Sequence, residues 1–525
     1  MRIPGLSLGF RLLPGAVPVA VAKVDSAEWN EASRLVHETG RKLVALWGSD
    51  NRERDATFSM FAAYAVDSGL AVVELSIPQL PEPEIPCYPD LSGMFPVANR
   101  MQRAVYDLLG IRASDASPSD PVDRRPWLRH GAWPEGVFPL RRDFDHTRRF
   151  DNPQEVYSFV RVAGDGVHEI PVGPIHAGII EPGHFRFSIV GEKVLRLEER
   201  LGYTHKGVDK RFESFTLANG GKLAGRVSGD STVAYAWAFA QAAESIMAVT
   251  PPARATWLRA LMLERERVAN HLGDLGALGN DAALAFGLSQ FMRLKEDWLR
   301  WAGRVFSHRF MMDCIVPGGV THDLPAEEAE RLARLSYDIE KELQELRHIY
   351  YEHAGLQDRF ITAGRVTPQL AVRLGLTGFA ARASGQARDL RVVHPVAPYD
   401  ELGVKAALRP NGDAAARVTV RFDELFESLR LIRLIVHKLP AGELRAEATT
   451  VPPAGALGFG WVEGWRGEVL VALEAGEGGM IRRGHAHDPS WQNWPILEHA
   501  AMDNIVPDFP LINKSFNLSY SGHDS

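Results

Sequence analysis

The stretch from Gly173 to Ser231 contains the first candidates in this sequence for side chains that transfer protons or bind a ligand. Three blocks, GPIHAGIIEPGHFRF, ERLGYTHKGVDKRFE and GRVSGDS, combine histidines and acidic residues with glycine turns. Imidazole exchanges protons near neutral pH, and a carboxyl group buried among apolar residues acquires a raised pKa that suits proton transfer. The candidates are His176, Glu181, His184, His205, Arg226 and Asp230.

Each candidate also has a structural interpretation that the sequence leaves open. Glu181 is either buried and passes protons, or it is a loop carboxylate that caps a backbone amide. His176 and His184 are either members of a proton relay or histidines held by structural hydrogen bonds. We expect Arg226 to face a shared pocket and to pair with Asp230, although Asp230 could equally stabilise the start of the next helix.

Composition limits the classes of function. The chain has 525 residues, 45% hydrophobic and 24% charged, which is ordinary for a globular protein with room for two or three domains. A net charge of -7 gives no basic footprint, so we expect no nucleic-acid partner. No apolar run reaches the roughly 18 residues of a membrane span, and no glycine-rich dinucleotide fingerprint is present.

The hydrophobic pattern predicts two domains. Residues 1–150 favour an α+β domain, with a helix and strand within 26–48, β-rich runs within 58–78 and a helix over Ala98–Ile111. Residues 112–155 are rich in Asp, Arg, Pro and Ser, which is typical of a linker or a surface crossing. Residues 151–525 favour a mainly α-helical domain with a peripheral antiparallel sheet.

The peripheral sheet is predicted from one hairpin pattern. Phe185, Phe187 and Ile189 alternate on one face, a Gly-Glu turn follows, and Leu195 and Leu197 resume the alternation. From Thr232 onward, long patterns with helical spacing predominate, and such helices pack as a bundle.

Two blocks of the N-terminal domain resemble the C-type subunit of complex I, the NADH–quinone oxidoreductase. They are the helix over Ala98–Ile111 and the block WPEGVFPLRRDFD, Trp133 to Asp145. The resemblance is partial, because Arg100 and Met101 replace an aromatic pair and Gln102 stands at an acidic position.

The second domain resembles the D-type subunit of complex I and the large subunit of membrane-bound nickel–iron hydrogenases of the hydrogenase-4/formate hydrogenlyase type. The matching blocks occur in the same order as in that family. They are the stretch from Gly173, LERERVANHLGDLG, VPGGV, GLTGFAARASG, EGWRGE and the C-terminal WPILEHAAMDNIVPDFPLINKSFNLSYSGHD. Together the two resemblances cover nearly the whole chain and imply a fused C/D-type subunit.

The resemblance also locates four metal-ligand positions that have lost their sulfur. Hydrogenases of this family hold nickel and iron with two CxxC pairs, and these positions are Ser228, Ser231, Ser519 and Gly522 here. A serine hydroxyl is hard and stays protonated near neutral pH, and glycine has no side chain. We therefore expect no nickel–iron centre and no metal bound by this chain.

Partner subunits and their cofactors follow from the same resemblance. It implies an iron–sulfur small subunit of the B type found in complex I, a ferredoxin-like subunit and membrane antiporter-like subunits, with the iron–sulfur clusters and any NADH site on those partners. His205 and Lys206 would contact the small subunit, or they belong to a solvated turn. His271 would lie near that subunit's terminal cluster and respond to its reduction, or it is a core histidine.

Three functions remain open at this point. The first is a catalytic-core subunit of a respiratory oxidoreductase complex, peripheral on the inner face of the cell membrane, that passes electrons to a quinone-like acceptor or couples their transfer to ion translocation. The usual quinone-binding histidine is replaced by Ile180, whereas Glu181 falls where hydrogenases place a proton-relay glutamate. The second is a redox-silent scaffold for the iron–sulfur subunit, and the third is an active hydrogenase.

Overall fold

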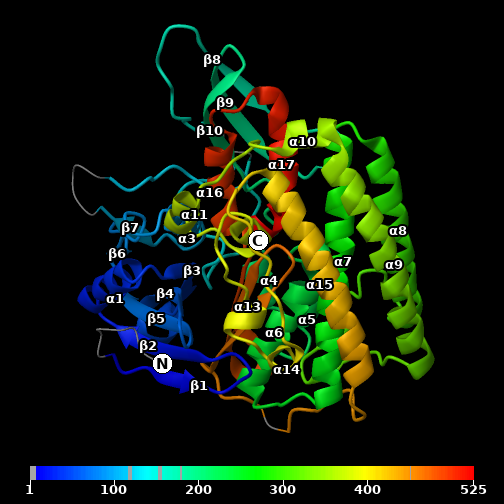
Figure 1. The fold of residues 1–525 in the computed structure, drawn as a ribbon. Helices are drawn as coiled ribbons and strands as arrows, with labels where there is room; N and C mark the ends of the chain where they lie inside the picture. Colours follow the sequence, from blue (N-terminus) through cyan, green and yellow to red (C-terminus); the bar gives the residue numbers. More distant parts are fainter. Residues whose placement is uncertain (1–7, 116–120, 152–155, 178–179, 450) are drawn as a thin grey trace.

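The chain adopts a mixed α/β fold with several small sheets and many helices (Figure 1). The computed structural model describes residues 8–115, 121–151, 156–177, 180–449 and 451–525. A bundle of long helices occupies one side, and the N-terminal sheet lies on the other (Figure 1). Within the described residues, no helix combines the length and the apolar character that a membrane crossing requires.

The N-terminal part is built on a five-stranded sheet with the order β1-β2-β5-β4-β3. Its strands are β1 (Arg11–Leu13), β2 (Val19–Val24), β3 (Lys42–Asp50), β4 (Thr57–Val66) and β5 (Gly69–Pro78), and its helices are α1 (Ser26–Glu38) and α3 (Ala98–Leu109). Asp25 and Glu28 form a capping box that fixes the start of α1. One face of the sheet packs on the buried sides of α1 and α3, as Trp29 and Met101 illustrate.

The bundle of the second part consists of long helices with buried inner faces. They are α6 (Thr232–Met247), α7 (Ala253–Asp281), α8 (Ala285–Val305), α9 (Ala326–Glu352) and α15 (Ala414–Lys438). Two short helices precede α6: α4 (Val208–Phe212) and α5 (Gly221–Ala224). Five more lie between α9 and α15: α10 (Ala354–Phe360), α11 (Pro368–Arg373), α12 (Gly378–Arg382), α13 (Leu390–Val393) and α14 (Tyr399–Leu402). The C-terminal segment adds α16 (Ser490–Ala501), α17 (Phe509–Phe516) and α18 (Tyr520–His523).

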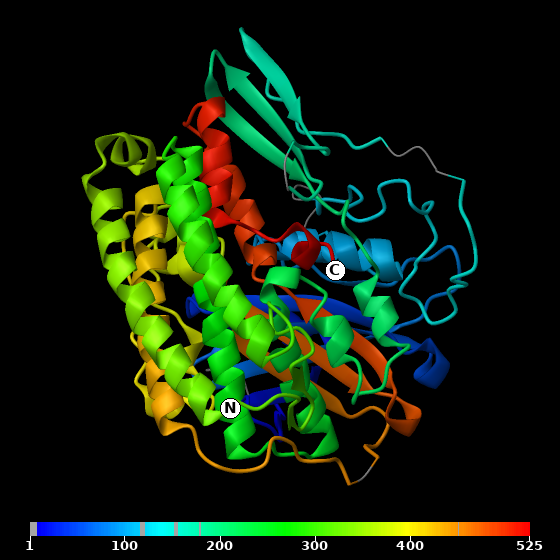
Figure 2. The ribbon, with the colours of Figure 1, turned by 90° about the vertical axis from the view of Figure 1, so that its right-hand side faces the viewer.

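A second sheet, which the sequence analysis did not predict, lies in the middle of the molecule (Figure 2). It consists of β13 (Leu457–Glu463), β14 (Glu468–Ala475) and β15 (Ile481–His487), paired antiparallel. One face meets the N-terminal sheet, where Trp47 stacks on His485 with ring centroids 5.2 Å apart. The other face lies against α6, and the approach is so close that a Cβ on Gly460 would fall 1.8 Å from the Ala238 carbonyl oxygen. The helical domain is therefore built around a central sheet.

The predicted peripheral hairpin is present and projects from the body (Figures 1 and 2). It contains β9 (His184–Val190) and β10 (Lys193–Arg200), with β8 (Val167–Val172) on the outer edge of β9. The expected alternation fails at one point, because the register shifts between Val194 and Arg196. This bulge buries Val194 and leaves Leu195 38% exposed, so Leu195 does not share the inward face with Leu197.

Candidate functional site

The four positions at which the resemblance places hydrogenase metal ligands come together from two distant parts of the chain. Ser228 and Ser231 flank the short turn that leads into α6, and Ser519 caps the start of α18. The hydroxyls of Ser228 and Ser519 lie 2.8 Å apart in a hydrogen bond. The backbone N–H of Gly522 donates to the Ser519 hydroxyl over 2.9 Å, and that of Ser231 donates to the Ser228 carbonyl over 3.0 Å.

A cavity of about 570 Å³ opens beside this cluster. Its walls include Glu181, Ser228, Asp230, Arg466, Lys514 and Ser519. Apolar side chains such as Ile180, Leu518 and Tyr520 complete the wall. This volume suits a small molecule or the headgroup of a larger one.

Arg466 is the principal charged residue of the cavity, and the sequence reasoning did not single it out. It lies in the tight turn between β13 and β14, and its two terminal nitrogens hold both carboxylate oxygens of Asp230 at 2.6 and 2.5 Å. Its Nε donates to the Asn517 carbonyl over 2.6 Å. Burial raises the pKa of Asp230, but the charge and hydrogen bonds of Arg466 outweigh that effect and lower it, so Asp230 is ionised near neutral pH.

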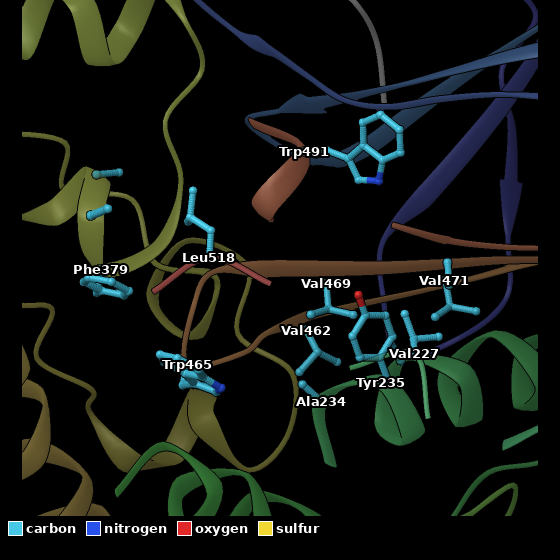
Figure 3. Packing of buried hydrophobic residues seen from close by; sticks show 14 of the residues in the cluster. Val227, Ala234, Tyr235, Phe379, Val462, Trp465, Val469, Val471, Trp491 and Leu518 are labelled. Atoms are coloured by element: carbon cyan, nitrogen blue, oxygen red, sulfur yellow. The ribbon is translucent and has the colours of Figure 1, made fainter. Parts of the chain in front are cut away.

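Figure 3 shows buried aromatic and aliphatic side chains that include Trp465, the residue before Arg466, together with Phe379 and Leu518. Trp465 stacks on Phe379 with ring centroids 6.4 Å apart, and its indole N–H donates to the Asp230 carbonyl over 3.0 Å. The backbone of this turn also approaches α12 closely, since a Cβ on Gly378 would fall 1.8 Å from the Arg466 carbonyl oxygen. The position of Arg466 is thus fixed by backbone packing as well as by its charge partner.

Arg226 does not have the expected role. Its guanidinium is 45% exposed and makes a bidentate pair with Asp313, with both N–O distances at 2.7 Å. It is not part of the cavity wall, and Asp230 pairs with Arg466 instead. The prediction that Arg226 faces the cavity and pairs with Asp230 is therefore wrong.

Glu181 lies at the cavity, but its carboxyl is not buried among apolar residues. Its side chain is exposed, and one oxygen accepts the backbone N–H of Ser521 over 3.1 Å. His176 and His184 each hydrogen-bond a backbone carbonyl, of Gly183 at 2.7 Å and Gly173 at 3.1 Å. Both histidines therefore have structural partners on the backbone beside β9.

His205 and Lys206 also bond within the chain. The His205 Nδ1 lies 2.8 Å from the Asp524 carbonyl oxygen, and the Lys206 ammonium donates to the carbonyls of Arg226 and Val227. Lys206 is exposed and His205 partly so. Their contact with a small subunit stays a prediction.

His271 is fully buried at the centre of the helical bundle. Its Nε2 lies 2.9 Å from Glu424, which in turn binds Arg382 at 2.8 Å. Burial lowers the pKa of His271 more than Glu424 raises it, so the imidazole is neutral near pH 7. Within this chain His271 is a core histidine, and its proximity to a partner's cluster stays a prediction.

Glu266 is a buried carboxyl that the sequence reasoning missed. It sits on α7 and accepts the backbone N–H groups of Val233 and Ala234 at 2.6 and 3.2 Å, at the start of α6 and directly after Ser231. Burial raises the pKa of Glu266 to about 8, and the nearby charge of Asp230 adds to the effect.

The residues present do not fit a nickel–iron centre. Two serine hydroxyls are already bonded to each other, Ser231 bonds Asp230 and Arg466, and position 522 has no side chain. A Cβ on Gly522 would lie 2.4 Å from a carboxylate oxygen of Asp488. Across the described residues, no group of three or more histidine, cysteine or carboxylate side chains is arranged to hold a metal ion.

Comparison with known families decides the relationship. Residues 22–150 match the family of the 30 kDa subunit of respiratory-chain NADH dehydrogenase, and residues 274–459 match that of its 49 kDa subunit. The chain is a fused member of these two complex I families. The fused subunit is 29% identical to formate hydrogenlyase subunit 5 of Escherichia coli K12, across 93% of its own length and 86% of the relative's. It is 28% identical to the C/D subunit of NADH-quinone oxidoreductase from Phocaeicola vulgatus, across 75% of its length and 78% of the relative's.

A solved structure supports the fold of the fused subunit. One chain in the structure of the membrane-bound sulfane sulfur reductase, an archaeal respiratory membrane complex, aligns with a TM-score of 0.65 and 23% identity. The alignment covers 70% of the fused subunit and all of that chain. The family of the fused subunit thus consists of subunits of oxidoreductase complexes.

Proposed function

We propose that the fused subunit provides the acceptor site of a membrane-associated oxidoreductase complex that holds no nickel–iron centre. Electrons would arrive from iron–sulfur clusters on partner subunits, and a small quinone-like acceptor would be reduced in the cavity. One observation carries the proposal: Ser228 and Ser519, two of the former ligand positions, wall a cavity of about 570 Å³ and offer only hydroxyls.

The charges on the cavity wall favour an uncharged acceptor over an anion. Glu181, Asp230 and Asp281 are opposed by Arg466 and Lys514, which leaves an excess of one negative charge. The guanidinium of Arg466 is already neutralised by a bidentate carboxylate. An anionic acceptor would therefore be repelled, whereas a neutral headgroup could accept a hydrogen bond from Lys514.

Proton supply to such an acceptor falls to residues at the edge of the cavity. Reduction of a quinone by two electrons takes up two protons. Asp230 is held ionised by Arg466 and is a poor donor near neutral pH. Glu181 is exposed beside the cavity, where water has access and could supply the protons.

The implied partners follow the family. An iron–sulfur small subunit of the B type found in complex I, a ferredoxin-like subunit and membrane antiporter-like subunits would place the fused subunit peripherally on the inner face of the cell membrane. Ion translocation would be the task of the membrane partners. The alternative is a redox-silent scaffold, which the closed Arg466–Asp230 pair would also suit.

The test uses the purified complex, with turnover of a short-chain quinone and co-purification of partners as separate measurements. We expect Asp230→Asn to lower turnover by about 10-fold or more, because Arg466 then lacks its charge partner at the cavity. Arg226→Ala is the matched control, since its exposed pair lies outside the cavity wall. Normal turnover of Asp230→Asn in a fully assembled complex would favour the scaffold, and stoichiometric nickel would reject the proposal.

A further inference from the structure

Asp488 fills the space that a side chain at position 522 would need. A Cβ on Gly522 would lie 2.4 Å from the Asp488 Oδ2 and 2.6 Å from its Cγ, both far inside ordinary contact distance. The backbone of Gly522 is not in the left-handed region, so conformation alone would permit any residue there. Space, and not backbone geometry, restricts this position to glycine.

Asp488 is held in that place by its own hydrogen bonds. Its side chain is buried, with the residue 1% exposed. One oxygen accepts the Tyr235 hydroxyl over 2.7 Å, and the other accepts the backbone N–H of Ser490 over 2.8 Å. A buried carboxylate that lost these donors would pay a large desolvation cost, so it cannot swing aside to admit a neighbour.

The same carboxylate is connected to the cavity wall through one residue. Asp488 accepts the backbone N–H of Ser490. The hydroxyl of Ser490 in turn accepts the backbone N–H of Ser519 over 2.9 Å. Ser519 then bonds Ser228 and the N–H of Gly522. Asp488 therefore lies behind the cluster of former ligand positions and orients the serine that reaches the cavity.

We infer that Asp488 is the positioning residue that has replaced the fourth ligand of this site. It supplies a fixed buried acid where a thiolate would have stood, orients Ser519 through Ser490, and reserves position 522 for glycine. The inference rests on the proposed function in that it concerns the same metal-free site. It adds that cysteines at the four positions alone would not restore a four-thiolate site, because Asp488 excludes the fourth.

A double-substitution cycle on the full chain tests the steric part. Gly522→Ala is expected to shift the unfolding equilibrium strongly toward the unfolded state. In the Asp488→Gly background, the change in the unfolding equilibrium constant caused by Gly522→Ala should be at least about 10-fold smaller. Asp488→Asn is the matched control, since it keeps the volume and the Tyr235 contact and should leave the cost of Gly522→Ala high. An equal cost of Gly522→Ala in the wild-type and Asp488→Gly backgrounds would overturn the inference.

A metal titration tests the ligand part with a spectroscopic signature. The variant S228C/S231C/S519C/G522C is titrated with Co²⁺, with and without Asp488→Gly. We expect the absorption of tetrahedral thiolate-bound Co²⁺ only when Asp488 is also replaced. The same spectrum with Asp488 in place would refute the inference. Both measurements use the isolated chain without turnover, so their failure is distinct from nickel in the native complex, which would reject the proposed function itself.

Discussion

Replacing Glu266 with Gln removes a carboxyl group that should be protonated in the folded chain and ionised in the unfolded chain between about pH 4.5 and 8. Glu266 is 5% exposed and receives two backbone N–H groups at the start of α6. Burial raises its pKa from 4.5 to about 8 despite those hydrogen bonds. Gln has nearly the same shape and stays neutral at every pH, so the change isolates the ionisation of one carboxyl.

The direction in which stability changes with pH follows from the pH at which the folded and the unfolded state each lose the proton of Glu266. Below pH 4.5 both states are protonated and the group contributes nothing. Between pH 4.5 and about 8 the unfolded chain has lost the proton and the folded chain keeps it, so stability falls as pH rises. The slope is at most about 1.4 kcal/mol per pH unit, with an upper limit of about 5 kcal/mol across the window.

The measurement is the free energy of unfolding in urea at pH 5, 6, 7 and 8 for wild type and Glu266→Gln. At pH 5 the variant should be equal or less stable by about 1 kcal/mol, because its amide cannot accept both N–H groups. Relative to wild type it should then gain stability steadily toward pH 8. A difference that stays flat from pH 5 to 8 would mean that Glu266 is already ionised and would refute the burial argument.

Glu264→Gln is the matched control on the same helix. Glu264 is equally buried, but Arg391 holds its pKa below the usual 4.5 despite burial. Its titration therefore lies below pH 4.5, and the loss of the carboxylate should destabilise the chain by a constant amount between pH 5 and 8.

Two further substitutions test the geometry away from the cavity. Arg226→Ala should cost less than about 1 kcal/mol of stability and leave acceptor binding unchanged, because its pair with Asp313 is solvent-exposed. Thermal unfolding measures the stability and ligand titration measures the binding. A loss of binding would show that Arg226 contributes to the acceptor site. Gly460→Ala should destabilise the chain by about 3 kcal/mol or more, since its Cβ would lie 1.8 Å from the Ala238 carbonyl oxygen. Gly93→Ala is the control and should be nearly neutral, because a Cβ on Gly93 would meet no atom within 4 Å. Urea unfolding measures both, and equal losses of stability would contradict the close packing of α6 on β13.

Local sequence pattern was sufficient for the elements that alternate or repeat regularly. The helical spacing from Thr232 predicted α6, α7, α9 and α15, and the alternation after His184 predicted the β9–β10 hairpin. These signals are local, because one buried face of a helix or strand repeats every few residues. The bulge at Val194 escaped the pattern, since an inserted residue changes which side chains face inward.

The central sheet was not predicted, for a physical reason. β14 is buried along its whole length, between α6 on one face and the N-terminal sheet on the other. A strand covered on both faces has no polar side to alternate with its apolar side, so its sequence lacks the period of a half-exposed strand. Burial on both faces is a property of the assembled fold.

By itself the sequence, through its resemblance to a family, located Ser228 and Ser231 in one block and Ser519 and Gly522 in another as the positions of interest. The tertiary structure alone decided which charges meet there. Asp230 pairs with Arg466, 236 residues away, and not with Arg226 four positions before it, whose guanidinium reaches Asp313. Whether two charged side chains form an ion pair depends on the distance between them in the folded structure. Their separation along the sequence does not determine that distance.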